Sequence, residues 1–211
     1  MSHSKSSLPK ISIITVVRNA VDTIEMTLKS VIDQTYDNIE YIVIDGESTD
    51  GTLEIINKHK DQISTIVSEK DDGLYDALNK GVKISTGDWI GILNSGDVFT
   101  SRTTLSDIFL SIKDLSDIDV FYGDAISVDG KIETLIKASS NIADIEKEPC
   151  YRHGASFLKR HIHKEYLFDI SKAPLISFAL DYDQMYRMYK GGVKFHKIDI
   201  PVIKYANRGA S

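Results

Sequence analysis

The stretch that decides the fold is WIGILNSGD, Trp89–Asp97, in which five apolar-biased residues run into a short polar turn. The first five residues are typical of a buried strand, and the last four of a turn that carries one carboxylate. Ligands of open α/β sheets bind where strands end at their carboxyl edge, so Asp97 is a candidate ligand for Mg²⁺ or Mn²⁺. A plain turn is the competing interpretation, because Asn, Ser, Gly and Asp are all common turn residues.

Working outward, this strand is the fourth in an alternating series. Ile11–Val17, Glu40–Ile44 and Ile63–Val67 are short apolar runs rich in β-branched residues, which are typical of buried strands. Amphipathic helical patterns separate the strands, with inner faces formed by Val21, Ile24, Leu28, Val31 and Ile32, then by Leu53, Ile56 and His59, then by Leu74, Ala77, Leu78 and Val82. This order predicts an α/β fold with a mainly parallel sheet and helices on both faces.

The second half of the chain is less regular and predicts antiparallel additions to the parallel core. The predicted elements are a strand or hairpin over Val120–Val128 that turns at Asp129-Gly130, a helix over Leu180–Lys190 closed by Gly191, and a strand over Val193–Tyr205 interrupted at Pro201.

Composition excludes several classes of function. The 211 residues carry a net charge of −6 without a basic stripe, which argues against nucleic acid as the main partner. No apolar run approaches the roughly 20 residues that cross a bilayer, and the first ten residues lack the apolar core of a signal peptide. We therefore expect a soluble, cytoplasmic protein. The single cysteine, Cys150, excludes an internal disulfide.

Common nucleotide and nucleophile motifs are absent from the sequence. It contains no G-x-G-x-x-G after the first strand, no phosphate-binding G-x-x-x-x-G-K-[ST] and no G-x-S-x-G elbow. The six histidines are scattered, which does not favour a zinc site.

Four acids follow predicted strands and should therefore gather at one sheet edge: Asp45, Asp71, Asp72 and Asp97. Four carboxylates in one cleft repel each other unless a cation or a donor-rich ligand is present. Their convergence predicts a ligand site more sharply than any single acid does.

The ordered set Ile11–Asn19, Asp45–Thr52, Asp72–Gly81 and Gly87–Asp97 resembles family 2 glycosyltransferases of the GT-A fold. The resemblance is close over residues 9–100 and looser through His153–Phe157, Asp181–Asp183 and Gly209–Ser211. It implies a Rossmann-like GT-A domain over residues 1–211, in which 9–98 bind the nucleotide sugar and 99–211 bind the acceptor. It also implies an inverting transfer from a nucleotide-diphosphate-sugar, commonly a UDP-sugar, with Mn²⁺ or Mg²⁺. The acceptor would be a hydroxyl of a saccharide or lipid-linked saccharide in surface polysaccharide synthesis.

The resemblance also implies donor-side roles. Val17, Arg18 and Asn19 would border the nucleotide, and Asp45 would hydrogen-bond the base. Asp72 and Gly73 would face the ribose and phosphates. At the position of the family's D-x-D-type motif, this sequence has Asn94, Ser95, Gly96 and Asp97. Asn94 and Gly96 stand where the family has acids, so Asp97 alone would ligate the metal as a carboxylate, with the diphosphate supplying much of the coordination.

On the acceptor side, the resemblance implies that Asp181 is the general base, with Asp183 as its rival. A helix N-cap is the competing role for Asp181, and an ion pair with Arg187, four residues on, is the competing role for Asp183. Asp124 and His153 would line the acceptor side, unless they are a turn acid and a satisfied loop histidine. Arg208, near the end of the chain, is either a phosphate contact or a surface residue.

Two other functions remain open at this stage. The thinned acid motif is compatible with a catalytically weak nucleotide-sugar-binding or scaffold protein of the same fold. A nucleotidyltransferase is less favoured, because Arg18-Asn19-Ala20 is a poor loop for gripping a triphosphate. The family continues beyond the motif at Gly209–Ser211, so the chain is either short or cut there. Peripheral association with the inner face of the membrane and a homodimer are both compatible with the sequence.

Overall fold

The computed structural model describes residues 8–112, 115–176 and 179–206. Arg208 and the Gly209–Ser211 motif lie outside the described residues. The strands are β1 (Ile11–Val17), β2 (Ile39–Asp45), β3 (Thr65–Ser68), β4 (Trp89–Ile92), β5 (Val98–Phe99), β6 (Val120–Asp129), β7 (Ile132–Ile136), β8 (Ser156–Lys159) and β9 (Phe195–Ala206). The α-helices are α1 (Ile24–Ile32), α2 (Thr52–Lys58), α3 (Leu74–Ile84), α4 (Thr104–Phe109), α5 (Arg160–Glu165), α6 (Ala173–Ile176) and α7 (Leu180–Lys190). Four 3₁₀ turns within these residues are η1 (Lys60–Gln62), η2 (Ile142–Glu146), η3 (His153–Ala155) and η4 (Ile170–Lys172).

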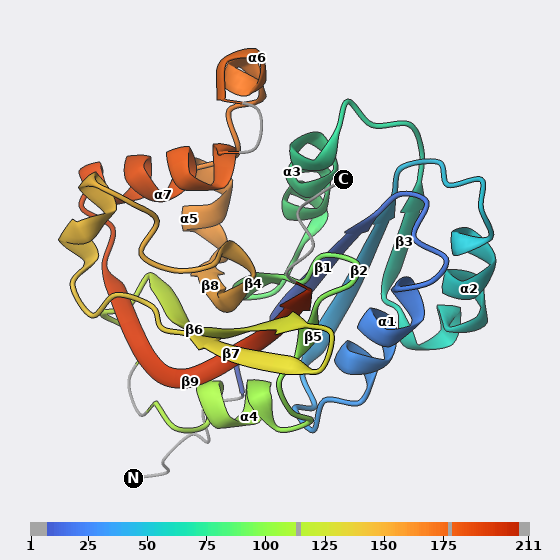
Figure 1. Ribbon diagram of the computed structural model, residues 1–211, viewed down its shortest axis with the longest axis horizontal. Coiled ribbons are helices and arrows are strands. Elements are labelled where there is room, and N and C mark those ends of the chain that lie inside the picture. The colour runs from blue at the N-terminus through green and yellow to red at the C-terminus, as the bar shows by residue number, and fades with distance from the viewer. Residues whose placement is uncertain (1–7, 113–114, 177–178, 207–211) are drawn as a thin grey trace, which may run out of the picture.

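These strands form one mixed sheet in the order β3-β2-β1-β4-β8-β6-β9-β5, with β7 paired to β6 (Figure 1). β1 runs parallel to β2 and β4, and β2 runs parallel to β3, which confirms the predicted parallel core. β8 is inserted antiparallel between β4 and β6, and β5 pairs antiparallel with β9. The predicted antiparallel additions are therefore present, and they extend the sheet beyond its parallel half.

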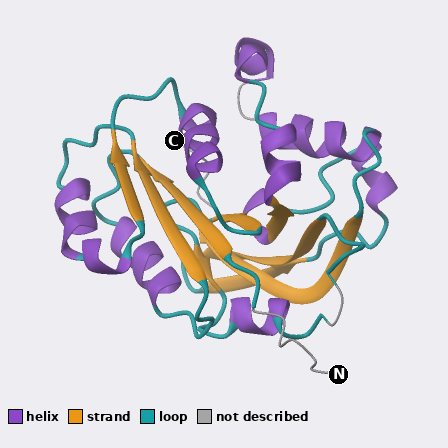
Figure 2. Ribbon diagram, turned by 180° about the vertical axis from the view of Figure 1, so that it is seen from behind, coloured by secondary structure: helices purple, strands orange, loops and turns teal. Residues whose placement is uncertain are grey.

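Helices cover both faces of the sheet, as predicted (Figure 2). On one face α1, α2 and α4 pack with the strands through residues such as Leu28, Ile56 and Ile108. On the other face α3 and the start of α7 pack through Val82 and Leu180. The alternating side-chain directions along a strand explain why β1 contributes to both clusters.

The predicted inner position of Leu74 is wrong. Its side chain is 46% exposed, whereas Ala77, Leu78 and Val82 of the same helix are buried. Leu74 is the first residue of α3, and the buried side chains begin one turn later, where the helix reaches the sheet.

Three details of the second half also differ from prediction. β9 continues through Pro201, because the pairing of β6 with β9 slips around Gly123 and places the proline at the irregularity. A Cβ on Gly123 would lie 2.5 Å from the carbonyl oxygen of Ile200, so the close approach needs glycine. The loop of the β6–β7 hairpin is shifted one residue, since Asp129 pairs with Ile132.

The end of α7 is the third correction. Gly191 has a right-handed φ of −79°, and the left-handed residue is Gly192, with φ +77°. Glycine tolerates the left-handed region without a Cβ clash, so Gly192 is where the chain leaves the helix. No helix in the described part of the chain is long and apolar enough to cross a membrane.

Candidate active site

Three loops meet at the carboxyl edge of the parallel strands, as predicted, and Gly46 marks the contact. A Cβ on Gly46 would lie 2.4 Å from Asp71 Oδ2 and 3.4 Å from the Cβ of Arg18. Arg18 follows β1, Gly46 follows β2 and Asp71 follows β3. The missing side chain at Gly46 is therefore what allows the Asp71 carboxylate to reach this corner.

Hydrogen bonds tie the loop after β1 to the loop after β2. The N–H of Asn19 donates to Ser48 Oγ at 2.8 Å, and Asn19 Oδ1 accepts from the Thr49 N–H at 2.9 Å. Asn19 adopts a left-handed φ of +49°, which asparagine tolerates better than most residues. The carbonyl oxygen of Val17 accepts from the Gly46 N–H at 2.9 Å. Val17 itself is buried, so it reaches this edge through its backbone.

Asp45 is fully buried at the end of β2 and only half satisfied. Its Oδ2 accepts hydrogen bonds from the Ser48 N–H at 3.1 Å and from Ser68 Oγ at 2.7 Å. Its Oδ1 is buried and has no hydrogen-bond partner among the described residues. A buried carboxylate oxygen without a donor is costly, which points to a ligand N–H or O–H at this position.

Asp72 and Gly73 lie at the entrance of α3. Asp72 is exposed, and its backbone N–H donates to Asp76 Oδ2 at 3.1 Å. The Gly73 N–H donates to Asp71 Oδ1 at 2.9 Å. The carboxylate that faces the Arg18 corner is thus Asp71. Asp71 is one of the four acids that were expected to gather at this edge, although the family resemblance implies no separate role for it.

The 94–97 loop after β4 is fixed by the hydroxyl of Thr27 on α1. Thr27 Oγ1 accepts from the Gly96 N–H and donates to the carbonyl oxygen of Asp97, both at 2.9 Å. The Ser95 N–H donates to the carbonyl oxygen of Val16 at 3.3 Å. Gly96 adopts a left-handed φ of +96°, which reverses the chain direction before Asp97.

The polar groups of this loop fit a metal ion that is shared with a ligand. Asn94 Oδ1 is buried and accepts no hydrogen bond from any described residue. Burial raises the pKa of Asp97 to about 7, against the opposing charge of Arg152, so its carboxylate would gain from a nearby cation. Within residues 8–112, 115–176 and 179–206, no group of three or more His, Cys, Asp or Glu could hold a metal. One carboxylate and one amide oxygen leave most coordination positions to phosphate oxygens and water.

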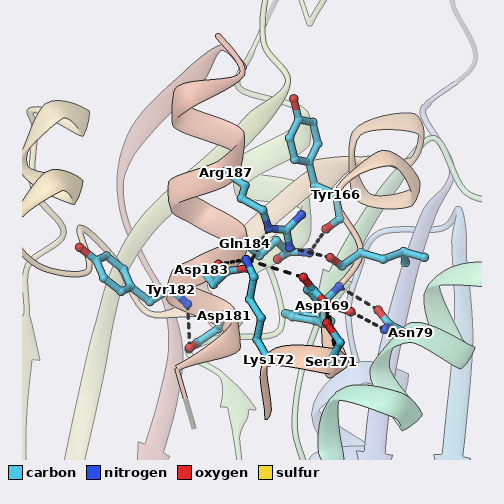
Figure 3. A network of polar contacts seen from close by, with 12 residues as sticks. Asn79, Tyr166, Asp169, Ser171, Lys172, Asp181, Tyr182, Asp183, Gln184 and Arg187 are labelled. Atoms are coloured by element: carbon cyan, nitrogen blue, oxygen red, sulfur yellow. Dashed lines mark hydrogen bonds and ion pairs between the residues drawn. The ribbon is translucent and has the colours of Figure 1, made fainter. Parts of the chain in front are cut away.

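A pocket of about 320 Å³ includes Asp181, His153 and Arg152 in its lining. Asp181 lies in the first turn of α7, and Oδ1 accepts the N–H of Tyr182 at 2.8 Å. Figure 3 shows this bond, and no other hydrogen bond to the Asp181 carboxylate is found among the described residues. The charge of Asp181 acts on His153 and on Tyr75, whose pKa rises to about 12, mainly through burial.

By contrast, both carboxylate oxygens of Asp183 form ion pairs. Lys172 Nζ lies 2.7 Å from Oδ1 and Arg187 Nε lies 2.8 Å from Oδ2. Both side chains are drawn around Asp183 in Figure 3. Burial would raise the pKa of Asp183, but the hydrogen bonds from Lys172 and Arg187 outweigh it and hold the pKa below its usual value. The ion pair with Arg187 predicted from the spacing is therefore present.

Asp124 lies in β6 and is 8% exposed. Its Oδ1 accepts the N–H of Ala138 at 2.9 Å and lies 3.6 Å from Lys197 Nζ. Its neighbour Gly123, rather than Asp124, lines the pocket that contains Asp181.

Arg152 is a further candidate site residue that no motif in the sequence indicates. Its guanidinium stacks over the ring of Tyr205 at 4.8 Å from the centroid. It lines the Asp181 pocket, and its charge opposes the rise that burial causes in the pKa of Asp97. A Cβ on the nearby Gly154 would lie 3.8 Å from Asp97 Oδ2, which brings this segment against the 94–97 loop. The only signal in the sequence was its place beside His153.

The sequence profile described as Glycosyl transferase family 2 matches residues 12–187. The chain belongs to this family. Solved structures with the GT-A glycosyltransferase fold superpose on nearly all of the chain, which establishes the fold. Staphylococcus aureus TarS (residues 1–349) in complex with UDP-GlcNAc aligns with a TM-score of 0.77 at 19% identity, over 96% of this chain and 60% of TarS.

A mannosyltransferase from Pyrobaculum calidifontis, in complex with GDP-Man and Mn²⁺, aligns with a TM-score of 0.73 at 19% identity. That alignment covers 97% of this family 2 chain and 59% of the mannosyltransferase.

Curated relatives of this family 2 chain are glycosyltransferases. A PGL/p-HBAD biosynthesis glycosyltransferase of Mycobacterium bovis is 34% identical over 121 residues, or 56% of this chain and 47% of that protein. The Escherichia coli UDP-Glc:alpha-D-GlcNAc-diphosphoundecaprenol beta-1,3-glucosyltransferase is 42% identical over 92 residues, or 43% of this chain and 37% of that protein. The matched segments thus span less than half the length of these relatives.

Proposed function

We propose that the protein is an inverting glycosyltransferase that moves a sugar from a UDP-sugar to a hydroxyl of a saccharide or lipid-linked saccharide. The observation that carries the proposal is the pair of buried, unpartnered oxygens at the ends of β2 and β4, Asp45 Oδ1 and Asn94 Oδ1, among the described residues. These strands flank β1. A nucleotide base with an N–H and a diphosphate with its cation are the ligands that would satisfy them.

The donor would lie along the carboxyl edge, in the half formed by residues 9–98. Asp45 Oδ1 accepts an N–H of the base, and the loop of Arg18 and Asn19 borders the nucleotide. Asp72 and Gly73 face the ribose and phosphates. The E. coli relative uses UDP-Glc by its name, and TarS binds UDP-GlcNAc, which favours uridine.

Asp97 and Asn94 would hold Mn²⁺ or Mg²⁺ together with the diphosphate. The bound cation supplies charge neutralisation for the departing nucleoside diphosphate. Arg152 contributes a second, permanent positive charge from the opposite wall. The Mn²⁺ in the Pyrobaculum neighbour supports a divalent cation in this fold.

Asp181 acts as the general base for the acceptor, in the half formed by residues 99–211. It accepts the proton of the attacking hydroxyl as that oxygen bonds to the anomeric carbon. The bond from the anomeric carbon to the diphosphate breaks on the opposite face, so the configuration inverts. Asp181 is favoured over Asp183 because both carboxylate oxygens of Asp183 already form ion pairs, with Lys172 and with Arg187.

The decisive experiment measures UDP release from UDP-glucose with Mn²⁺ or Mg²⁺, with and without a GlcNAc-diphospholipid acceptor. We expect release that needs the cation and falls by about a hundredfold or more in Asp97→Ala. Binding and turnover with GDP-sugars alone would overturn the uridine assignment.

The reduced acid motif, with Asp97 as the single carboxylate of the 94–97 loop, keeps a second candidate function open. A catalytically weak nucleotide-sugar-binding or scaffold protein would bind UDP-sugars in the same calorimetric titration and release no UDP. Peripheral membrane association and a homodimer belong to the same proposal, and vesicle flotation and sedimentation test them.

A further inference from the structure

Gln184 lies at the centre of a buried polar chain behind the acceptor pocket. Its side chain is fully buried on α7, three residues after Asp181. Residues spaced by three project from the same face of a helix, so Gln184 lies one turn along from the proposed base. The amide of Gln184 reaches three groups: the carbonyl of Tyr166 and the rings of His153 and His163.

The Tyr166 carbonyl determines which way this amide points. A carbonyl oxygen only accepts hydrogen bonds, so the atom that faces it at 2.6 Å is Gln184 Nε2. Gln184 Oε1 then faces His153 Nε2 at 3.2 Å. Because the amide oxygen also only accepts, His153 Nε2 must carry the proton.

The same series of hydrogen bonds leaves the other ring nitrogen of His153, Nδ1, without a proton. Burial lowers the pKa of His153, against the charge of Asp181 and the hydrogen bond to Gln184, so the ring is neutral near pH 7. A neutral imidazole carries one proton, and Nδ1 therefore keeps its lone pair. The contact with His163 is compatible with this orientation of the Gln184 amide. Burial lowers the pKa of His163 to about 3, so its ring is neutral, and its Nδ1 lies 3.4 Å from Gln184 Nε2 and can accept a hydrogen bond from it.

We propose that Gln184 is a positioning residue that holds His153 as the Nε2–H tautomer, so that His153 Nδ1 accepts a hydrogen bond from a hydroxyl of the acceptor sugar. His153 and Asp181 line the same pocket. Asp181 accepts the hydrogen bond of the reacting hydroxyl, and His153 accepts that of a second hydroxyl on the same sugar. His153 therefore helps to determine which hydroxyl of the acceptor reaches the base. This inference rests on the proposed function, because it requires a hydroxyl-bearing acceptor in that pocket.

The tautomer is measured directly by ¹⁵N NMR of the full chain labelled at histidine, with the His153 signals assigned by His153→Gln. We expect a protonated Nε2 and an unprotonated Nδ1 at pH 7 in the wild type. In Gln184→Met, which keeps the length of the side chain and removes both hydrogen bonds, we expect a mixture of tautomers. Met188→Leu is the matched control, a buried apolar change on the same helix. A wild-type proton on Nδ1 overturns the proposal, even where Gln184→Met does not fold.

The hydroxyl contact is tested by adding N-acetylglucosamine to the UDP-bound protein and following the His153 Nδ1 signal. We expect this signal to shift, and a pocket without any shift at Nδ1 contradicts the contact. Where the acceptor assay gives turnover, Gln184→Met should raise the acceptor KM about fivefold and leave the donor KM unchanged. The tautomer is read without turnover, so active transfer with the wrong tautomer refutes only this inference, whereas the expected tautomer without transfer refutes the proposed function.

Discussion

At the scale of single residues, pairing separates the two neighbouring acids of α7. Asp183 is held between Lys172 and Arg187, whereas Asp181 accepts one backbone hydrogen bond in the described part of the chain. A general base needs a lone pair directed at its substrate, and two ion pairs remove that freedom. The spacing that predicted the Asp183–Arg187 pair said nothing of Lys172, which comes from the segment before α7.

We predict that Asp181→Asn lowers kcat by about a hundredfold to ten-thousandfold and leaves the affinity for UDP unchanged. Removing the proposed base affects proton transfer, and the proposed nucleotide site is formed by other residues, at the carboxyl edge of the parallel strands. Steady-state kinetics and calorimetry with UDP measure the two effects. Asp183→Asn is the matched control and should cost stability more than turnover. If Asp183→Asn abolishes turnover and Asp181→Asn does not, the assignment of the base is wrong.

We predict that Arg152→Gln lowers kcat by about tenfold to a hundredfold, because its charge no longer offsets the charge on the leaving diphosphate. Arg152→Lys should recover part of the rate, since a lysine keeps the charge but loses the planar stacking on Tyr205. Transfer rates at several Mn²⁺ concentrations test this. Equal rates in wild type and Arg152→Gln at every Mn²⁺ concentration would exclude a role in leaving-group stabilisation.

At the scale of elements, strand ends are tied together on both edges of the parallel sheet. At the carboxyl edge, Thr27 of α1 holds the loop that contains Asp97. At the opposite edge, the Glu40 carboxylate of β2 accepts hydrogen bonds from Lys10 Nζ, from Ser12 Oγ of β1 and from Thr86, which precedes β4. One buried carboxylate therefore links three neighbouring strands.

This Glu40 link predicts a loss of stability in acid. Burial alone would raise the pKa of Glu40, but the hydrogen bonds from Lys10, Ser12 and Thr86 outweigh it and lower the pKa to about 2. The unfolded chain protonates this group near pH 4.5, so its contribution to the free energy of unfolding is complete above that pH and is lost as the pH falls toward 2.

Urea unfolding between pH 7 and pH 2.5 measures this effect. In Glu40→Gln the free energy of unfolding should be lower at pH 7 and should fall less steeply in acid. A parallel acid dependence in the variant and the wild type would contradict the assignment.

At the scale of the whole molecule, the proposed donor site and the proposed acceptor pocket are built on one continuous sheet. β8 joins the parallel strands to β6 and β9, and the chain before β8 brings Arg152 and His153 toward Asp97. A ligand that binds this edge binds the folded state only, so it stabilises the entire domain.

We predict that UDP at about one hundred times its Kd, with Mn²⁺, raises the Tm by about 5–10 °C. This corresponds to about 2.7 kcal/mol of binding free energy linked to unfolding. Thermal shifts with UDP, GDP, dTDP and CDP, with and without Mn²⁺, measure the effect and rank the bases. Asp45→Asn should reduce the shift with UDP, and a full shift in this variant would show that Asp45 does not contact the base.

The sequence by itself determined the alternation of strands and helices in the parallel half, the edge where the loops gather, and the family. Those features follow from local periodicity and from loops that directly follow strands, as in Ile11–Val17 and Trp89–Asp97. Only the tertiary structure decided which of these polar side chains are already paired within the protein and which are left to contact a ligand. Arg152 lies beside the 94–97 loop, Lys172 pairs with Asp183 and Gln184 orients His153, through contacts between residues that are 11 or more positions apart in the sequence. Such pairings depend on how distant segments pack together. Contacts of this kind produce no periodic pattern of residues that could be recognised in the sequence.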